Sequence, residues 1–161
     1  MKPLVSVFVI PFVIVSIFAA PSFGAGGGSS SDGSGSSNSF SQAFIAAETA
    51  VKAGDYEDAI GKLTRLIADE SENADAYNYL GYSNRKLGRM DQARNWYGKA
   101  LEIDPRHLGA NEYLGELYVQ TGEMEKAEAQ LDTLDGLCFF GCREFDQLKR
   151  SIADAKKRAG G

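Results

Sequence analysis

The sequence contains few of the residues from which enzyme active sites are usually built. Its 161 residues include one histidine and two cysteines. His107 has no evident Ser or Cys nucleophile to activate, and the carboxylates are scattered along solvated helix faces. No glycine-rich loop stands between a strand and a helix, as a phosphate-binding loop requires. We therefore predict that the protein is not an enzyme and has no catalytic residues, no bound metal and no cofactor.

The chain also has no excess of positive charge. Its formal net charge is -5 at pH 7, which argues against nonspecific binding to nucleic acid or to anionic lipid. A basic cluster, Lys156-Lys157-Arg158, follows a helical pattern near the C-terminus. The negative end of the helix dipole favours cations there, and we prefer this interpretation to a basic tail that binds nucleic acid. We predict no nucleic-acid partner.

The N-terminus has the three parts of a secretory signal peptide. A charged start, Met1-Lys2, precedes an apolar run, Leu4–Ala20, which is followed by the small residues Ser22 and Gly24. The pattern predicts a signal peptide over residues 1–24 that is removed on export, so that the mature protein has no membrane contact. The alternative is an uncleaved anchor, although the run is close to the shortest that spans a bilayer and a proline interrupts it.

Residues 25–39, AGGGSSSDGSGSSNS, consist almost entirely of glycine and serine. They include no large apolar side chain whose burial would offset the entropy lost on ordering. We predict a disordered linker over 25–39. It would be a spacer if the leader stays in a membrane, and a disordered mature N-terminus if the leader is cleaved.

The rest of the chain repeats itself at a fixed period. Shifting the sequence by 34 superposes Gly54, Gly88 and Gly122 without a gap, within GDYEDA, GRMDQA and GEMEKA. Apolar residues recur around these turns at three- and four-residue spacing, which places them on one helix face. Glycine at each turn suits a positive φ or a close helix approach. One hairpin of this length cannot bury its faces alone, so copies should stack.

A helix-turn-helix pattern with this period resembles the tetratricopeptide repeat family. The middle copy carries the family pattern at Tyr77, Leu80, Gly81, Ala93, Tyr97, Ala100 and Pro105. The third copy carries it at Leu114, Gly115, Tyr118, Ala127, Leu131 and Leu134, with Asn111 at the first aromatic position. The first copy is degenerate, because Ala46-Ala47 stands where the others have Leu-Gly.

The resemblance implies an all-α fold, an α-solenoid of three tetratricopeptide hairpins with a C-terminal capping helix. The predicted parts are three repeats within residues 40–139, divided as 40–73, 74–107 and 108–141, and a cap over 142–158. In the cap, Phe145, Leu148, Ile152 and Ala155 form one apolar stripe, and the other face is charged. A terminal helix of a repeat array needs such a polar outer face.

Cys138 and Cys142 lie between the third copy and the cap. A signal peptide implies an oxidising compartment, where a cysteine pair is normally bridged, and the short spacing is within disulfide reach. We predict a structural disulfide that holds the cap in place. Buried free thiols and a redox-active or metal-binding pair are the alternatives, although the spacing is not Cys-x-x-Cys. The segment from Leu137 to Ile152 also resembles the tail of small exported bacterial tetratricopeptide proteins.

In this family the first helix of each repeat lines a concave face, on which the resemblance implies that peptides lie. The residues predicted to line this groove are Phe44, Glu48, Lys52, Asn78, Tyr82, Arg85, Lys86, Glu112, Glu116 and Val119. Tyr82 is the expected anchor, and Asn78 and Arg85 would flank it and hold a backbone or carboxylate. For each residue the alternative is a merely solvated helix face. The acidic residues depart from the family's carboxylate clamp and suit a partner segment of mixed or basic charge.

These features predict a non-catalytic scaffold that binds a peptide or helix of another protein in the concave groove. The signal peptide and the bacterial resemblance place it in the periplasm or outside the cell. The alternatives are a redox accessory protein that uses Cys138 and Cys142, or a solenoid that assembles with copies of itself. The sequence leaves the partner, the process and the oligomeric state open.

Overall fold

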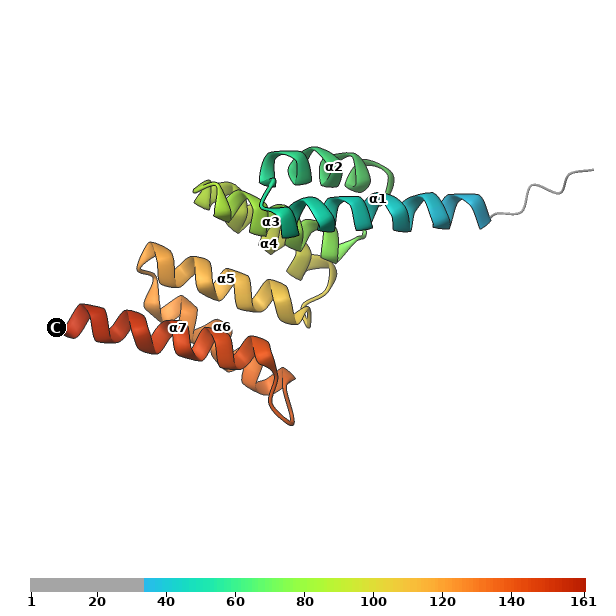
Figure 1. Cartoon of the computed structure of the whole chain (residues 1–161). Coiled ribbons are helices and arrows are strands. Elements are labelled where there is room, and N and C mark those ends of the chain that lie inside the picture. The colour runs from blue at the N-terminus through green and yellow to red at the C-terminus, as the bar shows by residue number, and fades with distance from the viewer. Residues whose placement is uncertain (1–33) are drawn as a thin grey trace, which may run out of the picture. The chain divides into compact units, whose positions relative to one another are not determined.

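The computed structural model describes residues 34–161, with side chains from Gln42 onward. All regular structure in this range is helical, as the sequence predicts (Figure 1). The helices are α1 (Ser34–Ala53), α2 (Tyr56–Asp69), α3 (Ala74–Lys86), α4 (Met90–Ile103), α5 (Leu108–Thr121), α6 (Met124–Leu137) and α7 (Arg143–Gly160). They form the hairpins α1–α2, α3–α4 and α5–α6, and α7 follows the last hairpin.

The three hairpin turns have one and the same backbone conformation. Gly54, Gly88 and Gly122 have φ values of 80°, 76° and 79°. In each turn the amide of the residue after glycine donates to a carbonyl in the last turn of the preceding helix, over 3.0, 2.9 and 2.8 Å. A left-handed residue closed by such a bond is the Schellman end of a helix, which glycine adopts without a steric penalty. The prediction of positive φ at the repeated glycines is confirmed.

The repeated small residues lie where the two helices of a hairpin meet. Ala59, Ala93 and Ala127 are fully buried, and Tyr97 is the largest side chain with no exposed surface. In the degenerate first copy, Ala47 is buried at the position that Gly81 has in the second, whereas Ala46 is exposed. Close packing at these positions explains why the period appears in the sequence at all.

Successive hairpins stack through both of their helices. The second helix of each hairpin packs against the first helix of the next element, so that α2 contacts α3, α4 contacts α5 and α6 contacts α7. The first helices also contact one another, α1 with α3, α3 with α5, and α5 with α7. One side of the stack is therefore built from the first helices alone.

Helix α7 occupies the place of a first helix in a fourth repeat. Shifting Leu80 by one period gives Leu114, and a second shift gives Leu148, which is fully buried. The apolar stripe of α7, which includes Ile152, packs in the same cluster as Ala127 and Leu134 of α6. The predicted cap is thus present, and it continues the register of the repeats.

The beginning of α1 differs from the expectation. The helix begins at Ser34, so residues 34–39 are helical although they were expected in the disordered linker. Once a helix is nucleated by packing further along, each added residue gains a hydrogen bond for little further cost. The predicted signal peptide and the linker residues 25–33 lie outside the described residues. Between residues 34 and 161, none of the helices combines the length and the apolar character that a bilayer crossing requires.

Candidate functional site

The predicted groove residues lie on α1, α3 and α5, the helices that form one side of the stack. We call this side the first-helix face. The structure divides most of its predicted residues into three groups, and Glu116 and Val119 are described after them. Tyr82, Arg85 and Lys86 form an aromatic and cationic cluster, Phe44, Glu48 and Lys52 are engaged around Tyr79, and Asn78 and Glu112 are buried.

Tyrosine rings from several helices meet at the middle of this face. The centroid of the Tyr82 ring lies 5.0 Å from that of Tyr113 and 6.1 Å from that of Tyr56. The Arg85 guanidinium carbon is 5.6 Å from the ring centroids of both Tyr82 and Tyr113. Arg85 Nε also donates to the hydroxyl of buried Tyr97 over 3.4 Å. Cation–π contacts and this bond hold a charged side chain in one orientation, with part of its surface still exposed.

The α1 part of the face is held by a tyrosine in the second hairpin. The Tyr79 hydroxyl donates to Glu48 over 3.1 Å, and the ring of Phe44 lies 5.7 Å from that of Tyr79. Lys52 pairs with Glu48 at 2.9 Å. The bonds from Lys52 and then from Tyr79 lower the pKa of Glu48, whereas burial and Glu48 raise the pKa of Tyr79 to about 12. Glu48 and Lys52 therefore satisfy each other before any partner arrives.

Asn78 and Glu112 differ from the expectation of solvent-facing groove residues. They occupy the same repeat position in adjacent copies, and only 6% and 4% of their surfaces are exposed. Burial, and then the neighbouring Glu144 and Glu116, raise the pKa of Glu112 to about 7, and Arg143 and Arg85 oppose the shift. Neighbouring helices cover these positions, which helical periodicity along one chain segment does not reveal.

Glu116 and Val119 are both partly exposed. Glu116 accepts a hydrogen bond of 3.0 Å from Ser151 of α7, so the cap uses this predicted groove residue. Val119 packs in the apolar cluster between α6 and α7.

Two tyrosines of this face were missed by the sequence interpretation. Tyr79 and Tyr113 share one repeat position, and each packs a ring against a predicted groove residue. The recurrence of tyrosine after one full period was a signal that could have found them. Their position does not belong to the family's aromatic pattern, so that pattern did not single them out.

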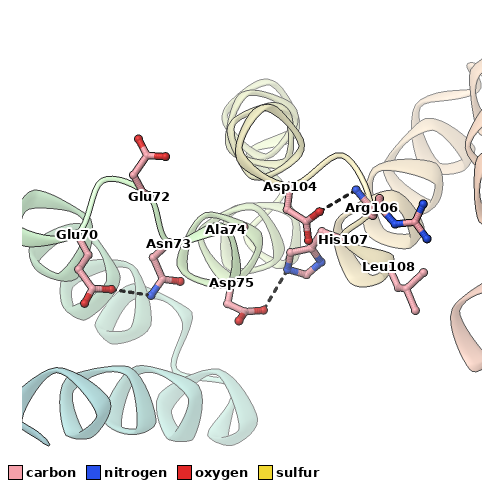
Figure 2. A pocket seen from close by; sticks show the side chains of 9 residues that line it. All are labelled: Glu70, Glu72, Asn73, Ala74, Asp75, Asp104, Arg106, His107 and Leu108. Carbon is pink, nitrogen blue, oxygen red and sulfur yellow. Dashed lines mark hydrogen bonds and ion pairs between the residues drawn. The ribbon is translucent and has the colours of Figure 1, made fainter. Parts of the chain in front are cut away.

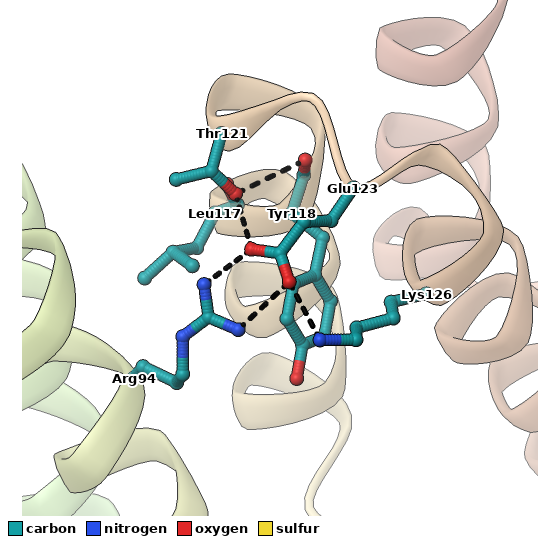
Figure 3. A network of polar contacts seen from close by, with 6 residues as sticks. All are labelled: Arg94, Leu117, Tyr118, Thr121, Glu123 and Lys126. Carbon is teal, nitrogen blue, oxygen red and sulfur yellow. Dashed lines mark hydrogen bonds and ion pairs between the residues drawn. The ribbon is translucent and has the colours of Figure 1, made fainter.

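A separate polar network joins α4 of the second hairpin to the α5–α6 turn of the third (Figure 3). Arg94 Nη1 donates to Glu123 over 3.1 Å, and Lys126 Nζ and Thr121 Oγ1 donate to the same carboxylate over 2.6 and 2.8 Å. The Arg94 and Lys126 cations also lie 5.0 and 5.4 Å from the Tyr118 ring centroid. Arg94 first, and then Lys126 and Thr121, hold the pKa of Glu123 well below its usual range. These contacts attach one hairpin to the next and do not involve the first-helix face.

A polar hollow of about 520 Å³ lies at the loops that join successive hairpins (Figure 2). The side chains of Asp75 and His107 point toward one another across it, with 3.1 Å between Oδ1 and Nε2. His107 Nδ1 accepts from the amide of Ala110, so the ring proton lies on Nε2 and is donated to Asp75. The lone histidine therefore caps α5 and links α3 to it, which is a structural role.

The loop between α6 and α7 carries the two cysteines at its ends. Their sulfur atoms are 2.01 Å apart, and Cys142 Sγ accepts from the amide of Phe145 at the start of α7. Oxidation of the pair in the cell stays a prediction. Between them Phe139 and Phe140 are 91% and 100% exposed.

Two family models described as tetratricopeptide repeat match residues 46–107 and 85–136, and together they span all three hairpins. The chain belongs to the tetratricopeptide repeat family. This tetratricopeptide protein is 30% identical over 93 residues to the ycf37 protein of Pyropia yezoensis, a match that covers 58% of this chain and 48% of that protein. The chain thus spans about half the length of that curated relative.

Solved structures of low identity share the fold. The type III secretion translocator chaperone SycD of Yersinia enterocolitica superposes with a TM-score of 0.68 at 20% identity, covering 78% of this chain and 88% of that one. SycD in complex with a peptide of the translocator YopD gives 0.65 at 21% identity, over 75% and 92% of the two chains. The TPR2B domain of yeast Sti1, in its Hsp70 complex, gives 0.65 at 23% identity, over 71% and 96%. The predicted family and the all-α solenoid are confirmed.

Proposed function

We propose that this protein is a non-catalytic interaction module that binds a segment of another protein on its first-helix face. The observation that carries the proposal is the placement of the Arg85 guanidinium over the adjacent rings of Tyr82 and Tyr113, with its Nε bonded to Tyr97. Arginine and tyrosine are the residues on which binding energy is most often concentrated in protein interfaces. Because Arg85 is already held in place, a partner would bind without the entropy loss of ordering that side chain.

The family supports the same proposal. Peptides of other proteins are bound by the solved relatives SycD, with a segment of YopD, and Sti1, with Hsp70. These two chains are only 21% and 23% identical to this one. The similarity therefore supports binding of a peptide by this fold, and the partner has to be identified by experiment.

We also propose that the protein is exported to the bacterial periplasm or secreted, after removal of residues 1–24. The motif at Ser22 and Gly24 supports this location. Cell fractionation and N-terminal sequencing of the purified protein test it. A mature chain that starts at Ala25 is the expected result, and an intact Met1 in the membrane fraction would favour the retained anchor instead.

The binding proposal is tested with a positional-scanning library of acetylated and amidated decapeptides, offered to the purified protein. Retained peptides are expected to shift the amide NMR signals of α1, α3 and α5, and to lose at least tenfold in affinity when Tyr82→Ala and Arg85→Ala are combined. The double variant Asn95→Ala with Lys99→Ala, on the exposed surface of α4, is the matched control.

Because Tyr82 and Arg85 are half-buried, helicity of their double variant is checked by circular dichroism. Lys86→Glu, at an exposed position beside the Tyr82 ring, provides a second variant that leaves the packing intact. Peptides that instead shift α4 and α6, and are lost with the control variant, would move the binding surface to the other side of the stack.

A further inference from the structure

We propose that Glu112 is the acceptor for a lysine or arginine side chain of the bound segment. This inference rests on the proposed function and adds the chemistry of the partner to it. It assigns this chain a preference for cationic segments, opposite to a site that captures a carboxylate.

The carboxylates near the middle of the first-helix face are not equivalent. Glu48 is satisfied by Lys52 and Tyr79, Glu116 by Ser151, and Glu144 by Arg143, which donates over 3.2 Å. The side chain of Glu112 makes no hydrogen bond and no ion pair with any residue in the described range, and only 4% of the residue is exposed. Its carboxylate oxygens are not among the fully covered atoms that lack a partner, so they retain some surface that a donor can reach. A carboxylate so little exposed and without a protein donor is costly to keep.

Asn78 provides the independent observation. Its Oδ1 is buried and has no hydrogen-bond partner among the described residues. Its Nδ2 lies toward Gly109 in the first turn of α5, where an added Cβ would come within 3.2 Å. Two acceptors at one repeat position, on adjacent first helices, are thus both left without donors among the described residues. Only the carboxylate of Glu112 can be reached by a partner, and lysine and arginine present three and five N–H donors to it.

The surroundings of Glu112 also favour a cation over an anion. The charged groups that act on its carboxyl from the helices packed against it are Glu116 on α5, Glu144 and Arg143 on α7, and Arg85 on α3. Arg143 is already engaged with Glu144, and Arg85 with the tyrosine rings and Tyr97. With both native cations occupied, the carboxyl retains its proton to a pH of about 7, the pKa that burial and the two neighbouring glutamates produce. An incoming ammonium or guanidinium would displace this proton.

Because only 4% of Glu112 is exposed, a long side chain suits it better than a short one. Lysine and arginine can pass an apolar stem along the rings of Tyr82 and Tyr113 and deliver the charge beyond them. The stem would take up apolar surface of the half-buried rings, and the charge would meet the carboxylate in surroundings of low dielectric, where the pair is strong.

The same decapeptide library tests the inference, because its blocked ends remove terminal charges from the result. Wild-type protein is expected to retain peptides enriched in lysine or arginine at one position. Glu112→Gln, which keeps the shape of the side chain, is expected to lose that enrichment and at least tenfold in affinity for the best peptide. Glu125→Gln, at an exposed position on α6, is the matched control and is expected to bind as the wild type does.

The affinity of the best peptide should also depend on pH in a particular way. Only the ionised carboxyl attracts a cation, so with a pKa of about 7 the affinity should rise up to about tenfold between pH 6 and pH 8. Glu112→Gln should bind with no such rise.

The outcomes separate this inference from the proposal beneath it. The role of Glu112 would be overturned if peptides bind the first-helix face without a preference for lysine or arginine, or if that preference survives Glu112→Gln. The proposed function of the first-helix face would still hold in that case. A library from which no peptide depends on Tyr82 and Arg85 would overturn both.

Discussion

Gly81 and Gly115 occupy the same position in the second and third hairpins, but different side chains lie against them. A methyl group at Gly81 would overlap the ring of Tyr97, which belongs to the same hairpin. A methyl group at Gly115 would overlap Leu148, which belongs to α7. The third hairpin has the smaller, partly exposed Leu131 at the position of Tyr97. A repeat position therefore determines where close packing occurs, and the size of the neighbours determines which element provides it.

Two further pairs follow the same comparison. At one position, Asn78 is neutral and Glu112 is ionisable, and both are buried. At the turn position, Arg89 pairs back to Glu57 of α2, and Glu123 pairs back to Arg94 of α4. The polarity of the pair is reversed, and the partner lies one helical turn further along its helix, since Glu57 is equivalent to Asp91 and not to Arg94. Equivalent positions of the hairpins thus make contacts in each copy, but the residues at those positions differ in charge and polarity.

The largest effects are expected from removing the two side chains that fill the space beside the glycines. Tyr97→Ala should cost about 3–5 kcal/mol of unfolding free energy and Leu148→Ala about 2–5 kcal/mol, because each leaves a cavity in closely packed surroundings. Denaturant titration gives the totals. Hydrogen exchange should show loss of protection centred on α3 and α4 for Tyr97→Ala, and on α6 and α7 for Leu148→Ala. Equal loss of protection along the whole chain in both variants would contradict the conclusion that Tyr97 and Leu148 stabilise different parts of the stack.

The next effect concerns pH and the pair Asn78 and Glu112. The pKa of Glu112 rises from 4.5 to about 7, so the folded state keeps a proton that the unfolded chain releases. The resulting stability is fully present below pH 4.5 and is lost as pH rises through 7, a fall of at most about 3 kcal/mol, because solvent near the carboxylate screens part of the effect. Glu112→Gln should remove that fall from the denaturation profile, and Asn78→Asp should add a second one. Parallel profiles for wild type and Glu112→Gln would count against a buried, unpaired carboxyl.

A smaller effect should distinguish the two turn ion pairs. Arg94→Met should destabilise the protein more than Arg89→Met, because the side chains of the Arg94–Glu123 pair are 32% and 27% exposed and those of the Arg89–Glu57 pair 42% and 61%. The pKa of Glu123 is lowered, so its contribution is present above pH 4.5 and is lost as pH falls through the lowered value. Urea titrations at pH 7 and in strong acid check both points. An equal loss in the two variants would remove the distinction between the turns.

The smallest effect is expected at the exposed loop before α7. Phe139→Ser with Phe140→Ser should change the free energy of unfolding by no more than about 0.5 kcal/mol, since neither ring is buried in the folded domain. Phe145→Ser, at the half-buried start of α7, is the contrasting variant and should destabilise the cap. Thermal unfolding followed by circular dichroism measures both. A large loss from the first variant would place the two rings against the domain.

Much of the fold could be predicted because each repeat has the same residue types at the same spacing. Gly54, Gly88 and Gly122 report a left-handed turn, and Ala59, Ala93 and Ala127 report a close helix approach, each from purely local requirements. The site was predictable only in part. Tyr82, Arg85 and Lys86 do lie together, but Asn78 and Glu112 are covered, and Arg85 is engaged by Tyr97 and Tyr113 from two other helices.

The amino-acid sequence by itself determined the period, the hairpins and the end of the array, because helix periodicity, turn glycines and small residues act over a few neighbours along the chain. Only the tertiary structure decided that α7 fills the space at Gly115, that Tyr79 reaches back to Glu48, and that Glu112 is left without a donor. Those features depend on which side chains of different helices come within a few ångströms of one another. Stacking sets that arrangement, and the spacing of residues within one helix does not contain it.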